Sequence, residues 1–502
     1  NVIGPELFES LGMIRTEELL QARRLDGGEQ FFTRFMEYGF SKKLSEAATI
    51  WGEKEVLGDM VRAIRLFRPL IVISRFSGTP ADGHGHHQLT GYLTPLAFRA
   101  AGDPSAFPEH FSEGLEPWKP MKLYVGLGFG GSSQTPPTVT VPTGDYDSVI
   151  GRSYFEIAME GRSQHKSQEM GMLELRGAQQ SGLRLLESTD GFTGNEKTIY
   201  DRLDVSIKGI ARLSDNTENP LADKLAQIQT VAEKALAEYD PFNLQKLLPT
   251  LAEGLKLCQA AEGSTRNPKT KFMLRLKARD FADALQAAGG IVVDALSDTE
   301  TVVAGDSLGV SVRVFAPAST EFRLDKVTIK SQAGWKTEAT DAPKPEAGNI
   351  FRPRTENSRE AAFFRVTTSA DAPPTQPYWL MRPREKFRFD WTEAADAKNL
   401  PFASELATAE VTMTVAGQQL TIMQPVEYRF ADDIRGELRR RLNVVPHVTH
   451  TLESSLMIVP RSSAAQQQRV VLSITNNAPR ETKGAISLDL DRKSTRLNSS
   501  HL

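Results

Sequence analysis

The sequence is poor in cysteine, in charge of one sign and in long apolar runs, and each deficit excludes a class of protein. Its 502 residues contain one cysteine, Cys258, which excludes an intramolecular disulfide and a CxxC metal site. The net charge of −3 provides no basic surface for nucleic acid. No apolar stretch reaches the ~18–20 residues of a membrane span. The composition, 40% hydrophobic and 25% charged, is that of a globular protein.

The first part of the chain has the pattern of a layered α/β domain. Apolar residues at helical spacing predict helices over 12–26, 53–67 and 89–101, and the run 70–76 is continuous, apolar and β-branched. Such a run predicts a strand buried on both faces, as in a parallel sheet. In sheets of this kind ligands bind outside the carboxyl ends of the strands. The loop that follows residue 76 occupies that position.

The pattern changes twice further along the chain. Strands are predicted at 121–124 and 138–141 and a closing helix at 153–172, and amphipathic helices are predicted at 221–236, 244–258 and 272–288. After Gly289-Gly290, period-two patterning with regular turn residues indicates β-sandwich modules. Their clearest strands are expected at 308–314, 322–329, 411–415, 456–459 and 469–474.

Three features resemble functional motifs and have simpler interpretations. Cys258 lies in an apolar helical pattern, which predicts a small core residue rather than a nucleophile. Residues 126–131 satisfy G-x-G-x-x-G, but a predicted strand follows instead of the helix that a dinucleotide site needs, so a glycine-rich loop is the better interpretation. His447 and His450 lie beside a proline in a β block and are interpreted as surface or turn residues.

The loop 77–88 holds three of the eight histidines of the chain within four residues, between a predicted strand and a predicted helix. If the helix begins inside this loop, the spacing of three places the imidazoles of His84 and His87 on one face. Zinc favours imidazole and carboxylate ligands, and a catalytic zinc usually has three protein ligands and a water. The two histidines are therefore candidate ligands for part of a metal site, because two imidazoles cannot supply all of its protein ligands.

Three segments, in order, resemble the PIG-L/LmbE family of zinc-dependent N-deacetylases. Residues 68–76 with Asp82-Gly-His-Gly-His-His-Gln-Leu-Thr-Gly91 resemble the second signature of the family, an HxxH that follows a strand. Upstream, Arg15, Glu18 and Ala22 match its R-x-x-E-x-x-x-A helix, and downstream 161–168 is similar to its closing H-x-SQ segment. The resemblance covers about residues 1–190, and the trailing modules are similar to those of long bacterial members.

The resemblance implies a fold and a role for several residues. The fold is α/β: a Rossmann-like three-layer deacetylase domain that lacks its first strand. His87 matches the family's zinc ligand and His84 its general acid or oxyanion partner, while Arg15 is a candidate substrate-binding residue. The family often has Asp where this chain has His86. Its AHPDD-type motif, which supplies the other ligands and the general base, is not in this sequence and is expected upstream of residue 1.

The implied function is a zinc-dependent hydrolase that removes an acetyl group from an N-acetylated amino sugar, such as an N-acetylglucosamine compound, or from a glycoconjugate. Zinc activates the water and polarises the amide, and the acid protonates the amine that leaves. The implied cofactor is Zn²⁺ and the partner a small-molecule or glycoconjugate substrate. These 502 residues alone are expected to bind zinc weakly without turnover. The alternatives are a degenerate carbohydrate-binding or structural protein, and another HxxH metallohydrolase.

The expected organisation has five parts. They are the deacetylase-like domain, a helical linker region, two β-sandwich-like modules, and a tail that resembles translated sequencing-adaptor sequence, with boundaries at 1–190, 191–290, 291–395, 396–490 and 491–502. Both ends are interpreted as cut, so any signal segment would lie upstream. The resemblance to long members of the family that have trailing β modules favours an exported protein.

Overall fold

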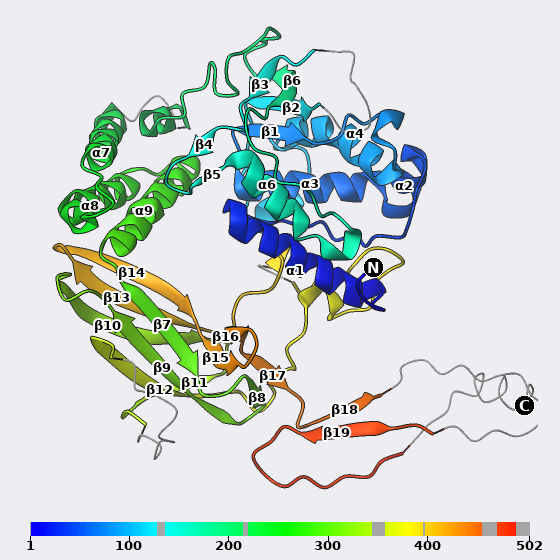
Figure 1. The fold of residues 1–502 in the computed structure, drawn as a ribbon, viewed down its shortest axis with the longest axis vertical. Helices are drawn as coiled ribbons and strands as arrows, with labels where there is room; N and C mark the ends of the chain where they lie inside the picture. Colours follow the sequence, from blue (N-terminus) through cyan, green and yellow to red (C-terminus); the bar gives the residue numbers. More distant parts are fainter. Residues whose placement is uncertain are drawn as a thin grey trace, which may run out of the picture. The chain divides into compact units, whose positions relative to one another are not determined.

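The structure is a computed structural model that describes residues 2–127, 136–213, 219–343, 357–394, 397–453 and 469–487. It is a mixed α/β protein with several separate sheets (Figure 1). The chain divides into two compact units. Unit 1 consists of Asn1–Arg212 and Gln376–Ser404, and unit 2 of Leu213–Thr375 and Glu405–Leu502. A segment distant in sequence therefore returns to complete unit 1.

Local capping contacts mark the end of α1 and the start of α6. α1 ends at Gly27, whose left-handed backbone (φ 70°) lets its N–H bind the Arg23 carbonyl. A capping box between Ser153 and Glu156 begins α6, which ends at Ser163, well short of the predicted residue 172. The helical segments are α1 (Phe8–Asp26), α2 (Leu44–Trp51), α3 (Glu53–Phe67), η1 (Pro80–Asp82), α4 (Gly85–Ala100), α5 (Glu109–Ser112), α6 (Tyr154–Ser163), η2 (Lys166–Gln168), η3 (Ile207–Leu213) and η5 (Tyr378–Leu380).

Unit 1 is built on a four-stranded sheet with the order β1-β2-β6-β3. β1 and β2 are parallel, with Ile71 opposite Lys122, and β6 is antiparallel to both β2 and β3. The strands are β1 (Ile71–Ser74), β2 (Lys122–Gly126), β3 (Val139–Val141) and β6 (Ser181–Ser188), with a separate short pair β4 (Tyr146–Asp147) and β5 (Arg152–Ser153).

The prediction that the strand at 70–76 is buried on both faces is wrong. β1 lies at the edge of the sheet and pairs with β2 alone among the described strands. The Ile73 side chain is 49% exposed. The run of β-branched residues has the composition of a central strand, but in this structure one of its edges and part of one face are uncovered.

The helices α2, α3 and α4 share one core beside this sheet. Ala47, Val56, Leu89 and Leu93 form its buried centre, with aromatic side chains packed around them. At the other end of α3, the fully buried Arg65 donates hydrogen bonds to the carbonyl oxygens of a single loop, those of residues 100, 101, 103, 106 and 107. One guanidinium thereby joins the end of α4 to the turns that follow it, in addition to the backbone hydrogen bonds that four of these carbonyls accept.

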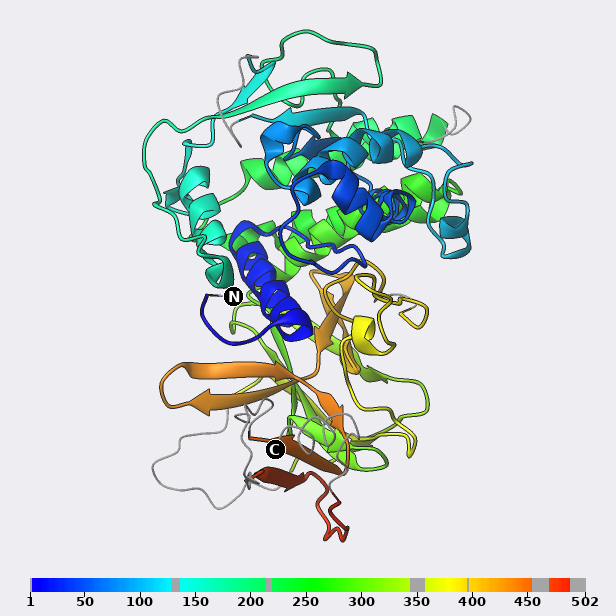
Figure 2. The same cartoon turned by 90° about the vertical axis from the view of Figure 1, so that its right-hand side faces the viewer.

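The returning segment, residues 376–404, is fixed to unit 1 by buried polar contacts. Asn399 is fully buried. Its Nδ2 donates a hydrogen bond to the Phe32 carbonyl (2.6 Å), and its Oδ1 accepts one from the Arg62 Nη1 (2.8 Å). The Arg384 Nε lies 2.7 Å from a carboxylate oxygen of Glu9 on α1. In both views α1, in dark blue, lies beside this yellow segment (Figure 1, Figure 2).

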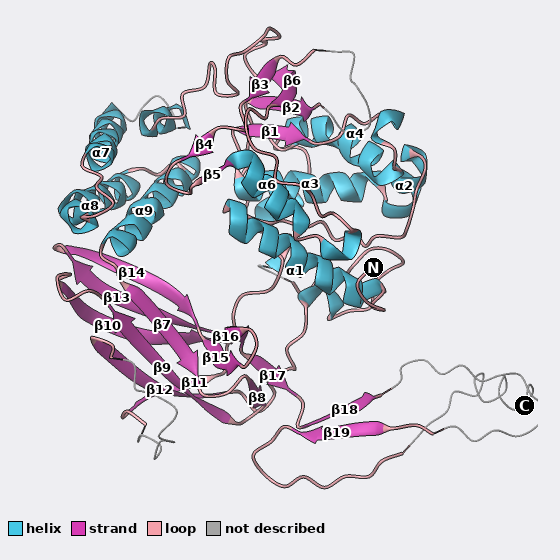
Figure 3. Ribbon diagram, in the orientation of Figure 1, coloured by secondary structure: helices cyan, strands magenta, loops and turns pink. Residues whose placement is uncertain are grey.

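Unit 2 contains three of the predicted helices and a β-sandwich (Figure 3). The helices are α7 (Asn219–Ala237), α8 (Leu248–Ser264) and α9 (Pro268–Ala288), with the short η4 (Leu244–Leu247) before α8. Cys258 is fully buried in α8, and burial raises its pKa to about 12, which confirms that it is a core residue.

The strands that were expected in two β modules share the same sheets. One sheet has the order β10-β13-β14 and the other β11-β12-β9-β7-β15-β16. Alternate residues of β9 and β13 are buried, as in sheets that face a common core. The strands are β7 (Val292–Ser297), β8 (Thr301–Val303), β9 (Ser307–Phe315), β10 (Phe322–Ser331), β11 (Lys336–Thr340), β12 (Glu360–Thr367), β13 (Ala407–Val415), β14 (Gln418–Pro425), β15 (Glu427–Asp432) and β16 (Gly436–Arg441).

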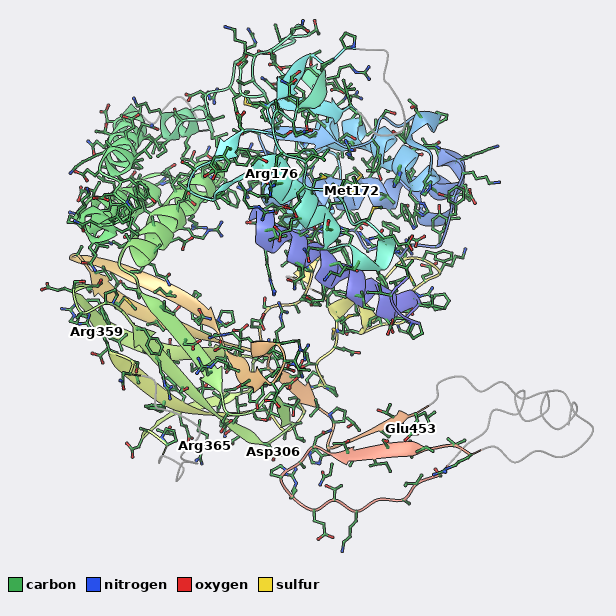
Figure 4. The ribbon with its side chains drawn as sticks, viewed as in Figure 1. Met172, Arg176, Asp306, Arg359, Arg365 and Glu453 are labelled. Carbon is green, nitrogen blue, oxygen red and sulfur yellow. The ribbon has the colours of Figure 1, made fainter. Side chains whose placement is uncertain are left out.

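Unit 2 also contains two short strand pairs. β8 pairs with β17 (Asn443–Val445), and β18 (Val448–Leu452) pairs with β19 (Leu472–Asn476). Arg359, labelled in Figure 4, donates to the Pro317 carbonyl (3.1 Å) beside the sandwich. The predicted strand at 456–459 lies outside the described residues, as does most of the glycine-rich loop 126–131. In the parts of the chain that the structure describes, no helix is long and apolar enough to cross a membrane.

Candidate functional site

The histidine loop leaves the carboxyl end of β1 and is organised by one buried carboxylate. Asp82 accepts hydrogen bonds from the backbone N–H groups of Ser77 (3.0 Å), Gly78 (2.7 Å) and Thr79 (3.1 Å). Its carboxylate thus satisfies three donors of the turn that leads into α4. The side chain of Asp82 shapes the loop that carries the histidines.

Close backbone contacts seat the loop against α4. A Cβ added at Gly91 would lie 2.1 Å from the backbone nitrogen of Gly78, and one at Gly85 would lie 2.3 Å from the Lys43 carbonyl oxygen. Neither position can accept a side chain without movement of the backbone. Gly91 is therefore required where α4 contacts the loop at Gly78, and Gly85 where the start of α4 contacts Lys43.

His84 and His87 lie side by side, as the spacing predicts. α4 begins at Gly85, inside the loop, with His84 as its N-cap residue. The two imidazole centroids are 5.1 Å apart and the rings are nearly parallel, at 11°. Phe76 covers the other face of His87, with a centroid distance of 4.1 Å, and Phe40 meets the His84 ring edge to face at 4.6 Å. His84 is exposed and His87 half-buried.

The His87 ring is oriented by a backbone carbonyl. Its Nδ1 lies 3.2 Å from the Asp82 carbonyl oxygen, which can only accept a hydrogen bond. This contact favours the tautomer that carries its proton on Nδ1 and its lone pair on Nε2. Histidines that bind metals are commonly held by a second-shell contact of this kind. Parallel stacked rings do not converge on a single ion, so the pair suits two different roles better than joint ligation.

His86 has different surroundings. Its Nδ1 lies 2.8 Å from the Ser41 hydroxyl, and its ring packs on Tyr38 at 4.4 Å and on Trp51 at 4.6 Å. Burial lowers the pKa of His86, the charges of His87 and His84 lower it further, and the charge of Glu37 raises it. The packed ring therefore connects the loop to the helical core.

The structure brings the other two resembling segments together. Glu18 of α1 accepts hydrogen bonds from the backbone N–H (2.6 Å) and the hydroxyl (2.8 Å) of Ser167, the serine of the H-x-SQ segment. All of these atoms are in buried residues. Gly161 of α6 faces Ala22 one turn further along α1, and a Cβ there would lie 3.9 Å from the Ala22 Cβ. Two segments about 150 residues apart thus form one packed helix pair.

Arg15 lies elsewhere in unit 1. Its guanidinium borders an aromatic cavity beside α1, and its Nη1 lies 3.5 Å from a Glu37 carboxylate oxygen. The residues of the histidine loop do not line this cavity in the described part of the chain. The structure therefore does not bring Arg15 together with His84 and His87.

Sequence reasoning missed a pair of cations at the carboxyl end of β1. Burial lowers the pKa of Arg75, which directly follows β1, and the positive charge of Arg162 on α6 lowers it further. A Cβ at Gly126, the last residue of β2, would lie 3.4 Å from an Arg75 nitrogen. The predicted strand 70–76 included Arg75, and the available signal was a charged residue near the carboxyl end of an otherwise apolar run, where ligand-binding residues gather.

The described residues do not form a complete metal centre. Among them, no group of three or more His, Cys, Asp or Glu side chains is placed to hold an ion. They offer zinc one oriented imidazole, that of His87, where a catalytic site needs about three protein ligands. His447 and His450 lie in or beside β18 of unit 2, with the His447 Nε2 3.0 Å from an Arg480 nitrogen. No family model matches the chain, and no curated protein matches its sequence.

Proposed function

We propose that this chain carries one side of the active site of a zinc-dependent N-deacetylase, in a Rossmann-like domain formed by unit 1. The substrate class is an N-acetylated amino sugar or glycoconjugate, whose acetyl group is removed by hydrolysis. The observation that carries the proposal is the arrangement of His84 and His87 at the carboxyl end of β1. The assembly of Glu18 with Ser167 supports it, because it joins the other two segments that resemble the family.

The two histidines have separate roles in this proposal. His87 is the metal ligand, since the Asp82 carbonyl holds its Nδ1 and directs the Nε2 lone pair to the opposite side of the ring. His84 is the general acid, because it is exposed and its ring stacks on His87 at 5.1 Å. In that position it can stabilise the oxyanion of the substrate and protonate the amine as it leaves.

Bound zinc would supply a Lewis acid and a water of lowered pKa. Among the described residues, no group of three or more His, Cys, Asp or Glu side chains could hold the ion, so the remaining ligands and the general base are not assigned to them. The proposal assigns them to a His-Pro-Asp-Asp type motif outside this sequence. The chain by itself is accordingly expected to bind zinc weakly and to release no amine from an N-acetylated sugar.

The test is an assay of the chain joined to its own upstream coding sequence, with N-acetylglucosamine compounds as substrates and detection of the free amine. His87→Ala should remove both bound zinc and activity. His84→Ala should retain zinc and lower kcat by about 10²- to 10⁴-fold, the usual contribution of an acid catalyst. His447→Ala, which removes a histidine of unit 2, is the matched control and should change neither.

Two results would overturn the proposal. One is activity that survives His87→Ala. The other is the absence of deacetylation although an upstream His-Pro-Asp-Asp motif is present and zinc is bound. If the upstream motif is replaced by residues that cannot bind zinc, the chain is instead a degenerate binding protein. Activity from these 502 residues alone would contradict the assignment of the missing groups to an upstream motif.

A further inference from the structure

Unit 1 contains a cavity of about 670 Å³ between α1, residues 32–39 and the returning segment 376–404. This volume is typical of sites for small organic ligands. Its described lining residues do not include His84 or His87, so it is distinct from the proposed zinc site. The hydrolysis proposed above does not account for it.

The cavity is lined mainly by apolar side chains, many of them aromatic. Residues from 32–39 and from 378–401 supply most of the lining, including Phe32, Phe35, Trp379, Phe387, Phe389 and Trp391. At its mouth, Leu7 and Phe8 are strongly exposed. Apolar side chains that line an open cavity keep part of their surface in contact with water. A ligand that fills the cavity removes this surface from water, which is favourable in free energy.

Hydrogen bonds join these two segments side by side, in a short antiparallel bridge with Phe35 opposite Arg388. The Met36 N–H donates to the Phe387 carbonyl and the Phe389 N–H to the Arg34 carbonyl, both at 2.8 Å. Arg34 is in turn fixed by the fully buried Asp59, and its guanidinium lies over the Trp391 ring at 5.2 Å. The cavity is therefore preformed, and a ligand need not order its walls.

The charged side chains of the wall are paired. A Glu37 carboxylate oxygen lies 3.5 Å from the Arg15 Nη1, and Glu9 is paired with Arg384. The cavity is thus neutral overall and does not favour an anion.

We propose that this cavity binds an uncharged aromatic or acyl compound. The apolar body of the ligand packs among the aromatic side chains of the lining. This inference does not rest on the deacetylase proposal. Loss of one function would leave the other testable, because the two sites share no ligand-contacting residue.

The test is a fluorescence titration of the full 502-residue chain with prodan, an uncharged naphthyl ketone whose emission shifts to the blue in apolar surroundings. Gly12 on α1 borders the cavity, and a Cβ there would meet nothing within 4 Å. Gly12→Phe should fill the volume and weaken binding at least about tenfold, since an occupied pocket excludes the ligand. Gly263→Phe on α8 is the matched control, because its Cβ also meets nothing within 4 Å. It should leave the affinity unchanged.

Competition with prodan identifies the class of ligand. Displacement by 2-acetonaphthone or by methyl decanoate identifies an aryl or an acyl ligand. The absence of saturable binding would overturn the proposal, as would equal affinity in the Gly12→Phe variant. Tighter binding of naphthalene-2-sulfonate than of prodan would overturn the assignment of an uncharged ligand.

Discussion

Replacement of Glu18 by alanine should destabilise unit 1 far more than any ordinary surface substitution. The carboxylate is buried, at 8% exposure, and accepts two hydrogen bonds from Ser167, at 2.6 and 2.8 Å. A hydrogen bond to a charged group contributes about 1.5–3 kcal/mol, and the Ser167 N–H would be left buried without a partner. We expect a loss of about 3 kcal/mol.

The assay is urea unfolding followed by tryptophan fluorescence, because four of the five tryptophans lie in unit 1. With an m-value of about 3 kcal/mol/M for a unit of this size, the midpoint should fall by about 1 M. Glu17→Ala, at the exposed neighbouring position of the same helix, should change it by less than about 0.2 M. A double-mutant cycle of Glu18→Ala and Ser167→Ala should give a coupling energy of at least about 1 kcal/mol. Equal effects of Glu17→Ala and Glu18→Ala would refute the reasoning.

Three further predictions concern the interior of unit 1. Lys122→Met should cost about 3–5 kcal/mol in urea unfolding, since it leaves the buried Glu196 carboxylate, 2.5 Å from the ammonium, without its cationic partner although the Tyr124 hydroxyl still donates to it; combination with Glu196→Gln should recover part of the loss. Burial lowers the pKa of His110 to about 4, so unit 1 should lose stability as the pH falls from about 6.5 to 4, and His110→Gln should reduce this dependence in pH-resolved melting. Gly91→Ala should destabilise by about 3 kcal/mol, because its Cβ would lie 2.1 Å from backbone, whereas Gly12→Ala should stabilise by about 1 kcal/mol; similar melting temperatures would contradict both.

The local elements could be predicted because their signals are local. The helix predicted at 53–67 has those bounds in the structure, since its apolar spacing is regular and Arg68-Pro69 ends it. Three histidines beside a strand end identified the loop, and the start of α4 inside it confirms the shared face of His84 and His87. Each of these inferences needed only residues within one turn or one loop.

The long-range features could not be predicted from patterns. The spacing of apolar residues in 376–404 does not reveal that the Asn399 side chain donates a hydrogen bond to the Phe32 carbonyl. The two residues are far apart in sequence and meet only in the folded chain. The expected module boundary at 395/396 falls inside this segment for the same reason. The edge position of β1 depends on which strands pair with it, and an apolar run does not specify its neighbours.

The most direct measurement of the central claim is the state of the imidazole nitrogens in ¹⁵N-histidine-labelled chain, observed by long-range ¹H–¹⁵N NMR before and after addition of Zn²⁺. His84→Asn and His87→Asn variants would assign the two rings. The account predicts that His87 carries its proton on Nδ1, as its contact with the Asp82 carbonyl requires, and that millimolar zinc shifts its Nε2 alone. A proton on the His87 Nε2, or an equal response to zinc of His84 and His87, would contradict it.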